Sequence, residues 1–191
     1  MRVIAGRLRG RRLKAPKGNH TRPTTDRVRE SLFSVLASLA GPEIGGGPCL
    51  DAFAGSGALG IEALSRGAGP TTFVETDRAA LSVLDDNLDS LSLRGESRVL
   101  KGSVFSLAKC GIGGPFSLIL LDPPYTLDAA QVRSLLSDLL STGAVEPGAL
   151  VSWEHASSTE VEWPEGFESV AQKRYGTIGI SVARHMEGRG S

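Results

Sequence analysis

Apolar positions along the chain follow two different spacings. Five short segments predict strands at 49–53, 71–75, 98–101, 116–121 and 149–154, and the clearest of them, 116–121, is apolar almost throughout, as in a strand buried on both faces. Between them, apolar residues recur every three or four positions and predict helices over 57–66, 78–91, 105–110 and 128–141. Strands that alternate with helices in this way form βαβ units with right-handed crossovers. The pattern therefore predicts an open α/β sheet that is mostly parallel.

The two flanking regions differ from this alternation. A helix start signal at Thr24, Thr25 and Asp26 precedes apolar residues at helical spacing, and Gly41 ends that pattern. Near the other end, 167–173 and 177–182 are strand-like and joined by a short turn, which predicts a hairpin. We expect this hairpin to form an antiparallel edge of the sheet.

Composition limits the kind of protein. The chain has 191 residues, of which 40% are hydrophobic and 22% charged, as expected for one compact domain. No apolar run approaches the roughly 20 residues that span a bilayer. Two cysteines, Cys49 and Cys110, are too few for a disulfide framework or a zinc site on their own. We therefore expect a cytoplasmic protein, by default monomeric, with no membrane and no metal partner.

Charge is distributed unevenly although the formal net charge is zero. Residues 1–30 contain ten Lys or Arg and only two acids, so the rest of the chain is acidic. A basic segment of this kind favours a polyanion partner, because Lys and Arg contacts to phosphate release counterions. We expect residues 1–23 to form a basic RNA-binding arm, possibly a hairpin, followed by a domain over 24–185 and a tail over 186–191. The candidate RNA contacts are Arg7, Arg9, Arg11, Arg12 and Arg22.

A glycine-rich loop joins the first predicted strand to its helix. Gly55, Gly57 and Gly60 allow a tight turn and a close approach of backbone to a ligand. Glu75, at the end of the next strand, can accept hydrogen bonds from two ribose hydroxyls. Dinucleotides and S-adenosylmethionine both fit such a loop, and a turn without a ligand is the plain alternative. Asp51 favours S-adenosylmethionine, because a carboxylate repels a pyrophosphate and attracts a cation.

The sequence Asp122-Pro123-Pro124-Tyr125 directly follows the most apolar strand. Proline rings fix the backbone, so the Asp122 carboxylate and the Pro123 carbonyl are held rigidly enough to accept both N–H bonds of an exocyclic amine. Tyr125 can stack on the heterocycle. These hydrogen bonds favour a pyramidal amine nitrogen whose lone pair can attack a methyl sulfonium directly. A proline-stiffened turn with a surface tyrosine is the alternative.

These motifs together resemble class I amino-methyltransferases. The run from Arg22 to Phe33, with the basic opening over residues 2–6 and 9–11, is similar to the RsmD family of bacterial methyltransferases, which act on guanine N2 in 16S ribosomal RNA. The resemblance extends over residues 1–185. It implies a Rossmann-like, mostly parallel seven-stranded sheet with an antiparallel C-terminal hairpin and a basic N-terminal extension.

The resemblance also implies roles for individual residues. The cofactor, S-adenosylmethionine, would be bound by Asp51, Phe53, Gly55, Gly57, Glu75 and Asp77. Many methyltransferases carry an acid after the third strand that holds the adenine amine; the matching stretch here has no acid, and Ser103 and the Val104 N–H are the candidate adenine contacts. Catalysis would depend on Asp122, Pro123, Pro124 and Tyr125. The substrate would be 16S rRNA, free or within a 30S subunit. Three alternatives stay open: an adenine-N6 methyltransferase on DNA or RNA, a non-catalytic RNA-binding or assembly factor, and a dinucleotide oxidoreductase, which leaves Asp122 and the basic arm unexplained.

Overall fold

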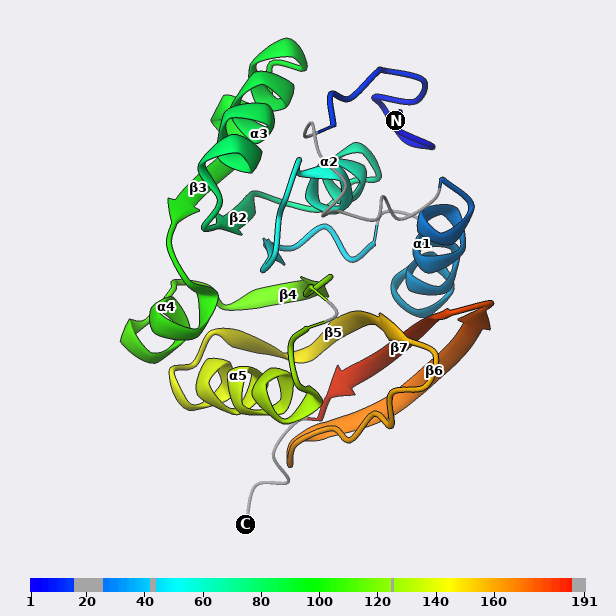
Figure 1. Cartoon of the computed structure of the whole chain (residues 1–191), viewed down its shortest axis with the longest axis vertical. Coiled ribbons are helices and arrows are strands. Elements are labelled where there is room, and N and C mark those ends of the chain that lie inside the picture. Colours follow the sequence, from blue (N-terminus) through cyan, green and yellow to red (C-terminus); the bar gives the residue numbers. More distant parts are fainter. Residues whose placement is uncertain (16–25, 42–43, 125, 187–191) are drawn as a thin grey trace.

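A seven-stranded sheet forms the centre of the molecule (Figure 1). The computed structural model describes residues 1–15, 26–41, 44–124 and 126–186. The strand order is β3-β2-β1-β4-β5-β7-β6. Strands β1 to β5 pair in parallel, and β7 and β6 add antiparallel to β5. The predicted mostly parallel sheet with an antiparallel C-terminal hairpin is confirmed.

The elements have the following bounds. The strands are β1 (Cys49–Asp51), β2 (Thr71–Glu75), β3 (Ser97–Lys101), β4 (Phe116–Leu121), β5 (Val145–Ala156), β6 (Phe167–Tyr175) and β7 (Ile178–His185). The helices are α1 (Asp26–Ala40), α2 (Ala58–Ser65), α3 (Arg78–Ser90), α4 (Val104–Cys110) and α5 (Ala129–Ser141), with a 3₁₀ turn at Arg94–Glu96.

Two strand predictions need correction at their ends. The first strand stops at Asp51 rather than at residue 53. The Ala52 amide makes one more hydrogen bond to the Leu120 oxygen of β4, and the chain then turns into the glycine loop. The fifth strand begins at Val145, four residues earlier than predicted. Its first part contains Glu146 and Pro147, which hide the strand pattern, and its pairing with β4 shifts register there.

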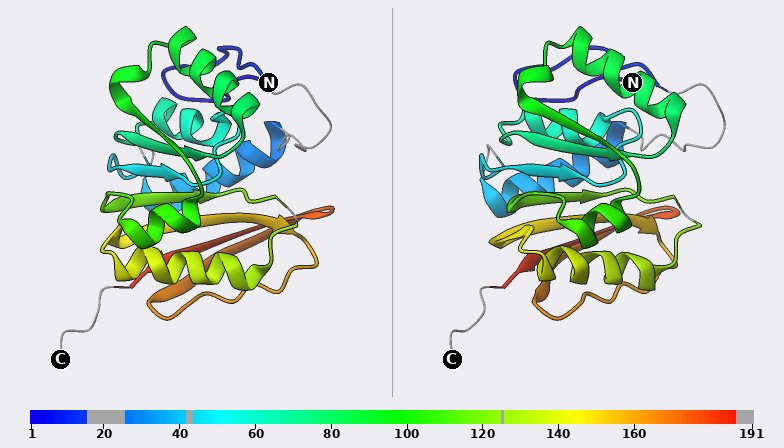
Figure 2. Two further views of the ribbon diagram at one scale, coloured as in Figure 1. Left: turned by 60° about the vertical axis from the view of Figure 1, so that its left-hand side comes forward. Right: turned by 90° about the vertical axis from the view of Figure 1, so that its left-hand side faces the viewer.

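Helices cover both faces of the sheet (Figure 2). On one face, α4 and α5 pack against apolar side chains of β1, β4 and β5, including Leu50, Ile119 and Val151. On the other face, α1 and α2 pack against Leu118 and Leu120, and α3 packs with α2 over β2. The helices leave the ends of the parallel strands uncovered. Ligands of open α/β sheets bind beyond the carboxyl ends of these strands. Within the described residues, none of the helices is long and apolar enough to cross a membrane.

The N-terminal segment, residues 1–15, lies against α2 and α3 (Figure 1). The predicted hairpin is reduced to one antiparallel bridge, between Arg2 and Arg12. Val3 and Leu13 are buried in the same apolar cluster as the side chains of α2 and α3. The segment is therefore anchored to the sheet domain by its own apolar residues.

A buried ionic group completes this anchoring. The Glu62 side chain of α2 is fully buried and accepts hydrogen bonds from the amides of Ile4 at 2.8 Å and Ala5 at 3.1 Å. It also accepts one from Arg66 Nε at 2.7 Å, and Arg29 Nε of α1 lies 3.9 Å away. Buried charges need such partners, since an unpaired charge in the interior is costly. Glu62 thus ties the N-terminal segment to α1 and α2.

Candidate active site

The glycine loop uses its glycines for two different purposes. A Cβ atom on Gly57 would lie 2.4 Å from Leu84 Cδ1, and one on Gly60 would lie 2.3 Å from the ring of Phe73. These two glycines let α2 pack closely on α3 and β2. Gly55 has φ +54°, and a Cβ there would have nothing within 4 Å. Its left-handed backbone therefore borders open space at the carboxyl end of β1.

Asp51 lies at the end of β1, beneath this loop, and is 1% exposed. Its Oδ2 accepts the Gly60 amide at 2.8 Å, while its Oδ1 is buried without a hydrogen-bond partner. Burial raises the pKa of Asp51 to about 7; the Gly60 amide opposes this shift, and the charges of Asp122 and Glu75 add to it. A buried acceptor with one unused oxygen is suited to a cationic donor.

Glu75 and Asp77 occupy different surroundings at the end of β2. Glu75 Oε2 accepts the Gly55 amide at 2.8 Å, and Oε1 accepts the amides of Thr76 and Asp77 at 2.7 and 2.8 Å. The carboxylate of Glu75 therefore borders the glycine loop directly. Asp77 is exposed and caps α3 by accepting the Ala80 amide at 2.8 Å. Its carboxylate stabilises the helix N-terminus.

The turn after β3 lies beside Glu75. The Gly102 amide donates to the Glu75 backbone oxygen at 3.0 Å, and Ser103 then forms the N-cap of α4 with no side-chain hydrogen bond to that helix. Val104 is buried in the apolar layer below. Phe53, on the other side of this layer, has its ring edge-to-face with Phe105 at a centroid distance of 6.1 Å. These residues form an apolar border to the site.

The Asp122 turn follows β4, the strand next to β1. Because Asp51 is opposite Leu120 in the register, Asp122 comes two residues further along the neighbouring strand. The charge of Asp122 contributes to the raised pKa of Asp51, as expected for carboxylates at one edge of the sheet. Pro123 is buried and Pro124 is exposed. Tyr125 lies outside the described residues.

One acidic residue at this edge was not singled out by the sequence analysis. Glu154 of β5 is only 5% exposed. Trp153 is opposite Leu121 in the register of β5 with β4, so Glu154 and Asp122 follow at the same level on adjacent strands. The signal in the sequence is an acid at the end of the predicted strand 149–154. Glu75, Asp51, Asp122 and Glu154 thus form a carboxylate row across β2, β1, β4 and β5.

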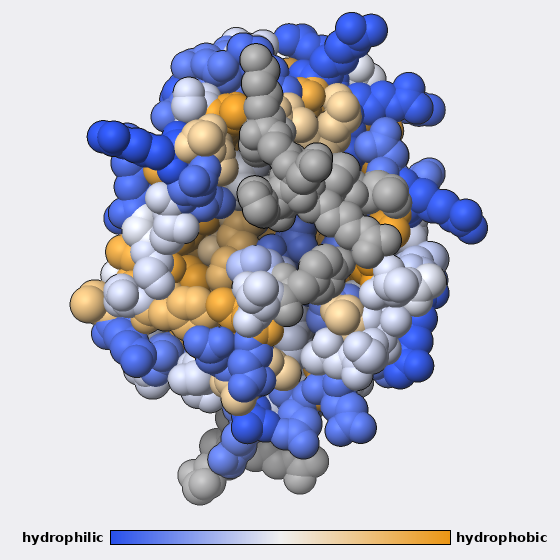
Figure 3. All heavy atoms as spheres, in the orientation of Figure 1, coloured by the Kyte–Doolittle hydropathy of each residue, from blue (hydrophilic) through white to orange (hydrophobic). Residues whose placement is uncertain are grey.

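The candidate RNA-binding arginines are spread over the N-terminal segment. Arg7 pairs with Glu96 at 2.7 Å, and the guanidinium of Arg11 donates to the Ser90 backbone oxygen at 3.0 Å. Arg9 and Arg12 are exposed and form no ion pair with any described residue. Arg22 lies outside the described residues. Figure 3 shows hydrophilic side chains projecting from the upper part of the molecule, where this segment and α3 lie.

Asn87 of α3 connects the basic segment with the glycine loop. Its Oδ1 accepts the Lys14 amide at 2.8 Å. Its Nδ2 donates to the Lys14 backbone oxygen at 3.1 Å and to the Ser56 backbone oxygen at 2.9 Å. The end of the N-terminal segment is therefore held next to the loop that borders the carboxylate row.

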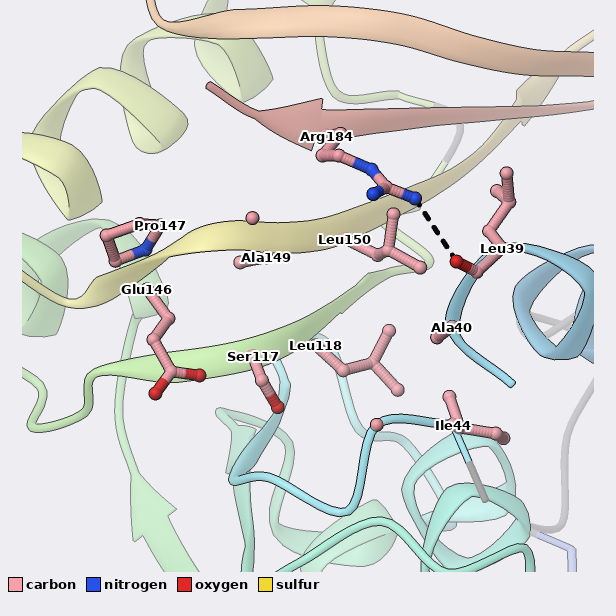
Figure 4. Close-up of a pocket in the computed structure, with 12 residues that line it drawn as sticks. Leu39, Ala40, Ile44, Ser117, Leu118, Glu146, Pro147, Ala149, Leu150 and Arg184 are labelled. Atoms are coloured by element: carbon pink, nitrogen blue, oxygen red, sulfur yellow. Dashed lines mark hydrogen bonds between the residues drawn. The ribbon is translucent and has the colours of Figure 1, made fainter. Parts of the chain in front are cut away.

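The opposite edge of the sheet has a different character. A cavity of about 210 Å³ lies between α1 and the early parts of β4 and β5 (Figure 4). Its lining is largely apolar, with Leu39, Ile44 and Leu150, and Arg184 donates from its guanidinium to the Leu39 backbone oxygen at 3.2 Å. Among the residues that the structure describes, no group of three or more His, Cys, Asp or Glu side chains could hold a metal. The candidate active site therefore lies at the carboxyl ends of the parallel strands, where the carboxylate row is found.

A doubly covered seven-stranded sheet with its last strand pair antiparallel, and with a glycine loop and acids at the carboxyl ends, defines the fold of class I methyltransferases. Solved structures agree: a candidate methyltransferase of Escherichia coli, yhhF, superposes with a TM-score of 0.82 at 32% identity, covering 97% of this chain and 98% of that one.

Sequence comparison identifies the family. A family model described as Conserved hypothetical protein 95 matches residues 1–184. The ribosomal RNA small subunit methyltransferase D of Haemophilus influenzae is 36% identical over 180 residues, 93% of this chain and 90% of that protein. A candidate rRNA methyltransferase of Bacillus subtilis, YlbH, is 39% identical over 189 residues, 95% and 97% of the two chains. The chain belongs to the ribosomal RNA small subunit methyltransferase D (RsmD) family.

Proposed function

We propose that the protein transfers a methyl group from S-adenosylmethionine to the exocyclic N2 amine of a guanine in 16S rRNA. The observation that carries this proposal is the position of Asp122. It ends the strand next to β1, so the Asp122-Pro123-Pro124 turn and the glycine loop border one site. The relatives named as small-subunit rRNA methyltransferases support the substrate class.

The cofactor fits the residues at the carboxyl ends of β1 and β2. S-adenosylmethionine supplies an electrophilic methyl group on a positively charged sulfur, next to a cationic amino group. Asp51 offers a buried, unused Oδ1 to a cationic donor. Glu75 offers its carboxylate to ribose hydroxyls, beside the open backbone of Gly55. Ser103, Val104 and Phe53 would border the adenine. Asp77, which caps α3 through Oδ1, would contact the cofactor from the end of β2.

Asp122 prepares the amine for methylation. Its carboxylate and the Pro123 carbonyl accept the two N–H bonds of the amine, which orients the nitrogen lone pair toward the methyl carbon. Bound S-adenosylmethionine would supply the methyl carbon to this lone pair, and the electron pair of the C–S bond would remain on sulfur. The amine then loses one proton, and Asp122 is placed to accept or relay it. Two prolines fix this geometry, and pre-positioned groups of this kind lower the barrier without reorganisation. Tyr125 would stack on the base.

The RNA partner is favoured by the charge of the N-terminal segment. Arg9 and Arg12 are the best candidates for phosphate contacts, because they are exposed and have no ion pair among the described residues. Arg7 and Arg11 already have protein partners. We place the reaction in the cytoplasm, with a monomer acting on rRNA that is free or assembled into a 30S subunit.

The test uses S-adenosylmethionine with a labelled methyl group. The protein is incubated with unmodified 16S rRNA and with 30S subunits, and the RNA is digested to nucleosides. Labelled N2-methylguanosine is the expected product, and the two substrates differ in yield according to the assembly state that is recognised. Labelled N6-methyladenosine would instead support the adenine-N6 alternative. Cofactor binding without any labelled nucleoside, on RNA or DNA, would support the non-catalytic alternative.

A further inference from the structure

Glu154 is the member of the carboxylate row to which the proposed reaction gives no task. Its side chain is 5% exposed and stands on β5 between the buried residues Trp153 and His155. A buried carboxylate is costly unless it is hydrogen-bonded. What Glu154 can bind beyond the protein is therefore decided by its position relative to Asp122.

The register places Glu154 beside Asp122. Leu120 is opposite Ser152 and Leu121 is opposite Trp153, so the next level along the two strands brings Asp122 and Glu154 together. Side chains alternate between the faces of a sheet. Leu120 packs on the α1 face while Leu121 and Trp153 pack on the α5 face, so Glu154 points toward the α1 face. Asp122 is the first residue after β4, and continuing the alternation past Leu121 puts it on the same face. Adjacent strands are about 4.8 Å apart.

This pair matches two neighbouring donors of guanine. The Watson–Crick edge of guanine presents the N2 amine and, on the next ring atom, the N1–H donor. Adenine presents its exocyclic amine beside an N1 lone pair, which is an acceptor. A single carboxylate next to a carbonyl can hold either amine, whereas a second carboxylate accepts guanine N1–H and repels adenine N1. Proteins that act on an extruded base read this edge by hydrogen bonds.

We propose that Glu154 is the guanine-specificity residue: its carboxylate accepts the N1–H of the target guanine while Asp122 holds the N2 amine. This inference rests on the proposed function. Burial of Glu154 strengthens the discrimination, because a buried hydrogen-bonding group left facing the wrong base is costly. In this chain the Asp122-Pro123-Pro124 turn therefore binds guanine rather than adenine, because Glu154 lies beside it on β5.

The test replaces the target guanine by 2-aminopurine in an otherwise identical RNA, at the nucleotide mapped by the labelling experiment. This base keeps the N2 amine but has an acceptor at N1. Wild-type protein should methylate guanine with a kcat/KM at least about 100-fold above that for 2-aminopurine. In E154Q, guanine methylation should fall about 100-fold. The amide of glutamine can donate to N1, so the preference for guanine over 2-aminopurine should shrink at least tenfold.

The controls separate specificity from folding. Glu160→Gln makes the same chemical change at an exposed position just beyond β5 and should leave both substrates unaffected. An equal loss on both bases in E154Q would make Glu154 structural and overturn the inference. Equal use of the two bases by the wild type would overturn it too, and this arm needs no variant to fold. Absence of any guanine methylation by the wild type would instead overturn the proposed function.

Discussion

The carboxylate row and the anchor of the N-terminal segment differ in how their charged side chains are paired. At the row, carboxylates of the same sign lie at one edge of the sheet, and Asp51 is buried with a pKa raised to about 7. Beneath the N-terminal segment, the buried carboxylate of Glu62 in α2 meets hydrogen-bond donors: Arg66 Nε and the amides of Ile4 and Ala5.

This difference distinguishes residues that bind ligands from residues that stabilise the fold. Like charges at one edge raise the free energy of the folded protein, and a cationic ligand relieves that cost. Paired buried charges fix a segment in place, and removing one partner is strongly destabilising. Substitutions in the row should therefore affect function most, and substitutions around Glu62 should affect stability most.

The largest effect is expected for Asp122→Ala. Loss of the carboxylate that orients the amine should lower kcat by about 10²–10³-fold, the range found when one pre-positioned hydrogen-bonding group is removed. Cofactor affinity, measured by titration calorimetry, should change less than about threefold, which is under 1 kcal/mol. Asp128→Ala is the matched control, because Asp128 caps α5. It should cost about 1 kcal/mol of stability and keep turnover. Normal turnover in Asp122→Ala would remove Asp122 from the mechanism.

Glu62→Gln should give the largest loss of stability. The substitution removes the buried negative charge that lies 2.7 Å from Arg66 Nε and 3.9 Å from the fully buried Arg29, which keeps, among the described residues, only its pair with the half-exposed Asp26. Breaking a buried ion pair typically costs about 3–5 kcal/mol, and urea unfolding measures the change. Glu96→Gln is the control, since its pair with Arg7 is half exposed. It should change stability by less than about 1 kcal/mol. Comparable losses in the two variants would show that the Glu62 group does not anchor the segment.

Asp51→Asn should improve stability while weakening cofactor binding. In the wild type the pKa of Asp51 is about 7 in the folded state against an ordinary value of 3.8, so between these pH values the folded state holds a proton that the unfolded state has lost. Stability therefore falls as pH rises from about 4 to about 7 and is then constant. The asparagine variant has no such fall, so it should melt above the wild type at pH 8, by a margin that disappears near pH 4.

Cofactor affinity has the opposite dependence in the wild type. Only the ionised Asp51 attracts a cationic amino group, so affinity should rise about tenfold between pH 6 and pH 8 with a pKa of about 7. Calorimetric titration at several pH values measures this rise. It should be absent in Asp51→Asn and retained in Asp128→Asn. A rise that persists in Asp51→Asn would assign the titration to another group.

Sequence reasoning identified the fold because its signals are local. The run from Phe116 to Leu121 is apolar and forms β4 with the same ends as predicted. The motif around Asp122 likewise depends only on consecutive residues. The right-handedness of βαβ crossovers then limits the ways in which the parallel strands can be arranged.

The remaining features depend on contacts that are distant in the chain. Docking of the N-terminal segment requires Glu62, which is 58 positions from Ile4. Asp77 caps α3, which its place after β2 does not reveal, and its role as a cofactor ligand stays a prediction. Glu154 becomes informative only when the register sets it beside Asp122. Neither the composition nor the periodicity of the sequence indicates which residues these side chains contact.

The smallest expected effect concerns the exposed arginines of the N-terminal segment. Because Arg12 is exposed and has no ion pair among the described residues, its contact with RNA phosphate should release about one counterion. Arg12→Ala should therefore weaken RNA binding a few-fold and reduce the slope of log K against log salt by about 0.7–0.9. Filter binding over a series of salt concentrations measures this slope. Lys173→Ala, exposed on β6 at the far edge of the sheet, is the control and should leave the slope unchanged. A smaller slope in Lys173→Ala than in Arg12→Ala would show that the RNA binds at the β6 edge of the sheet. The N-terminal segment would then contribute to stability only, whereas the carboxylate row would contribute to ligand binding.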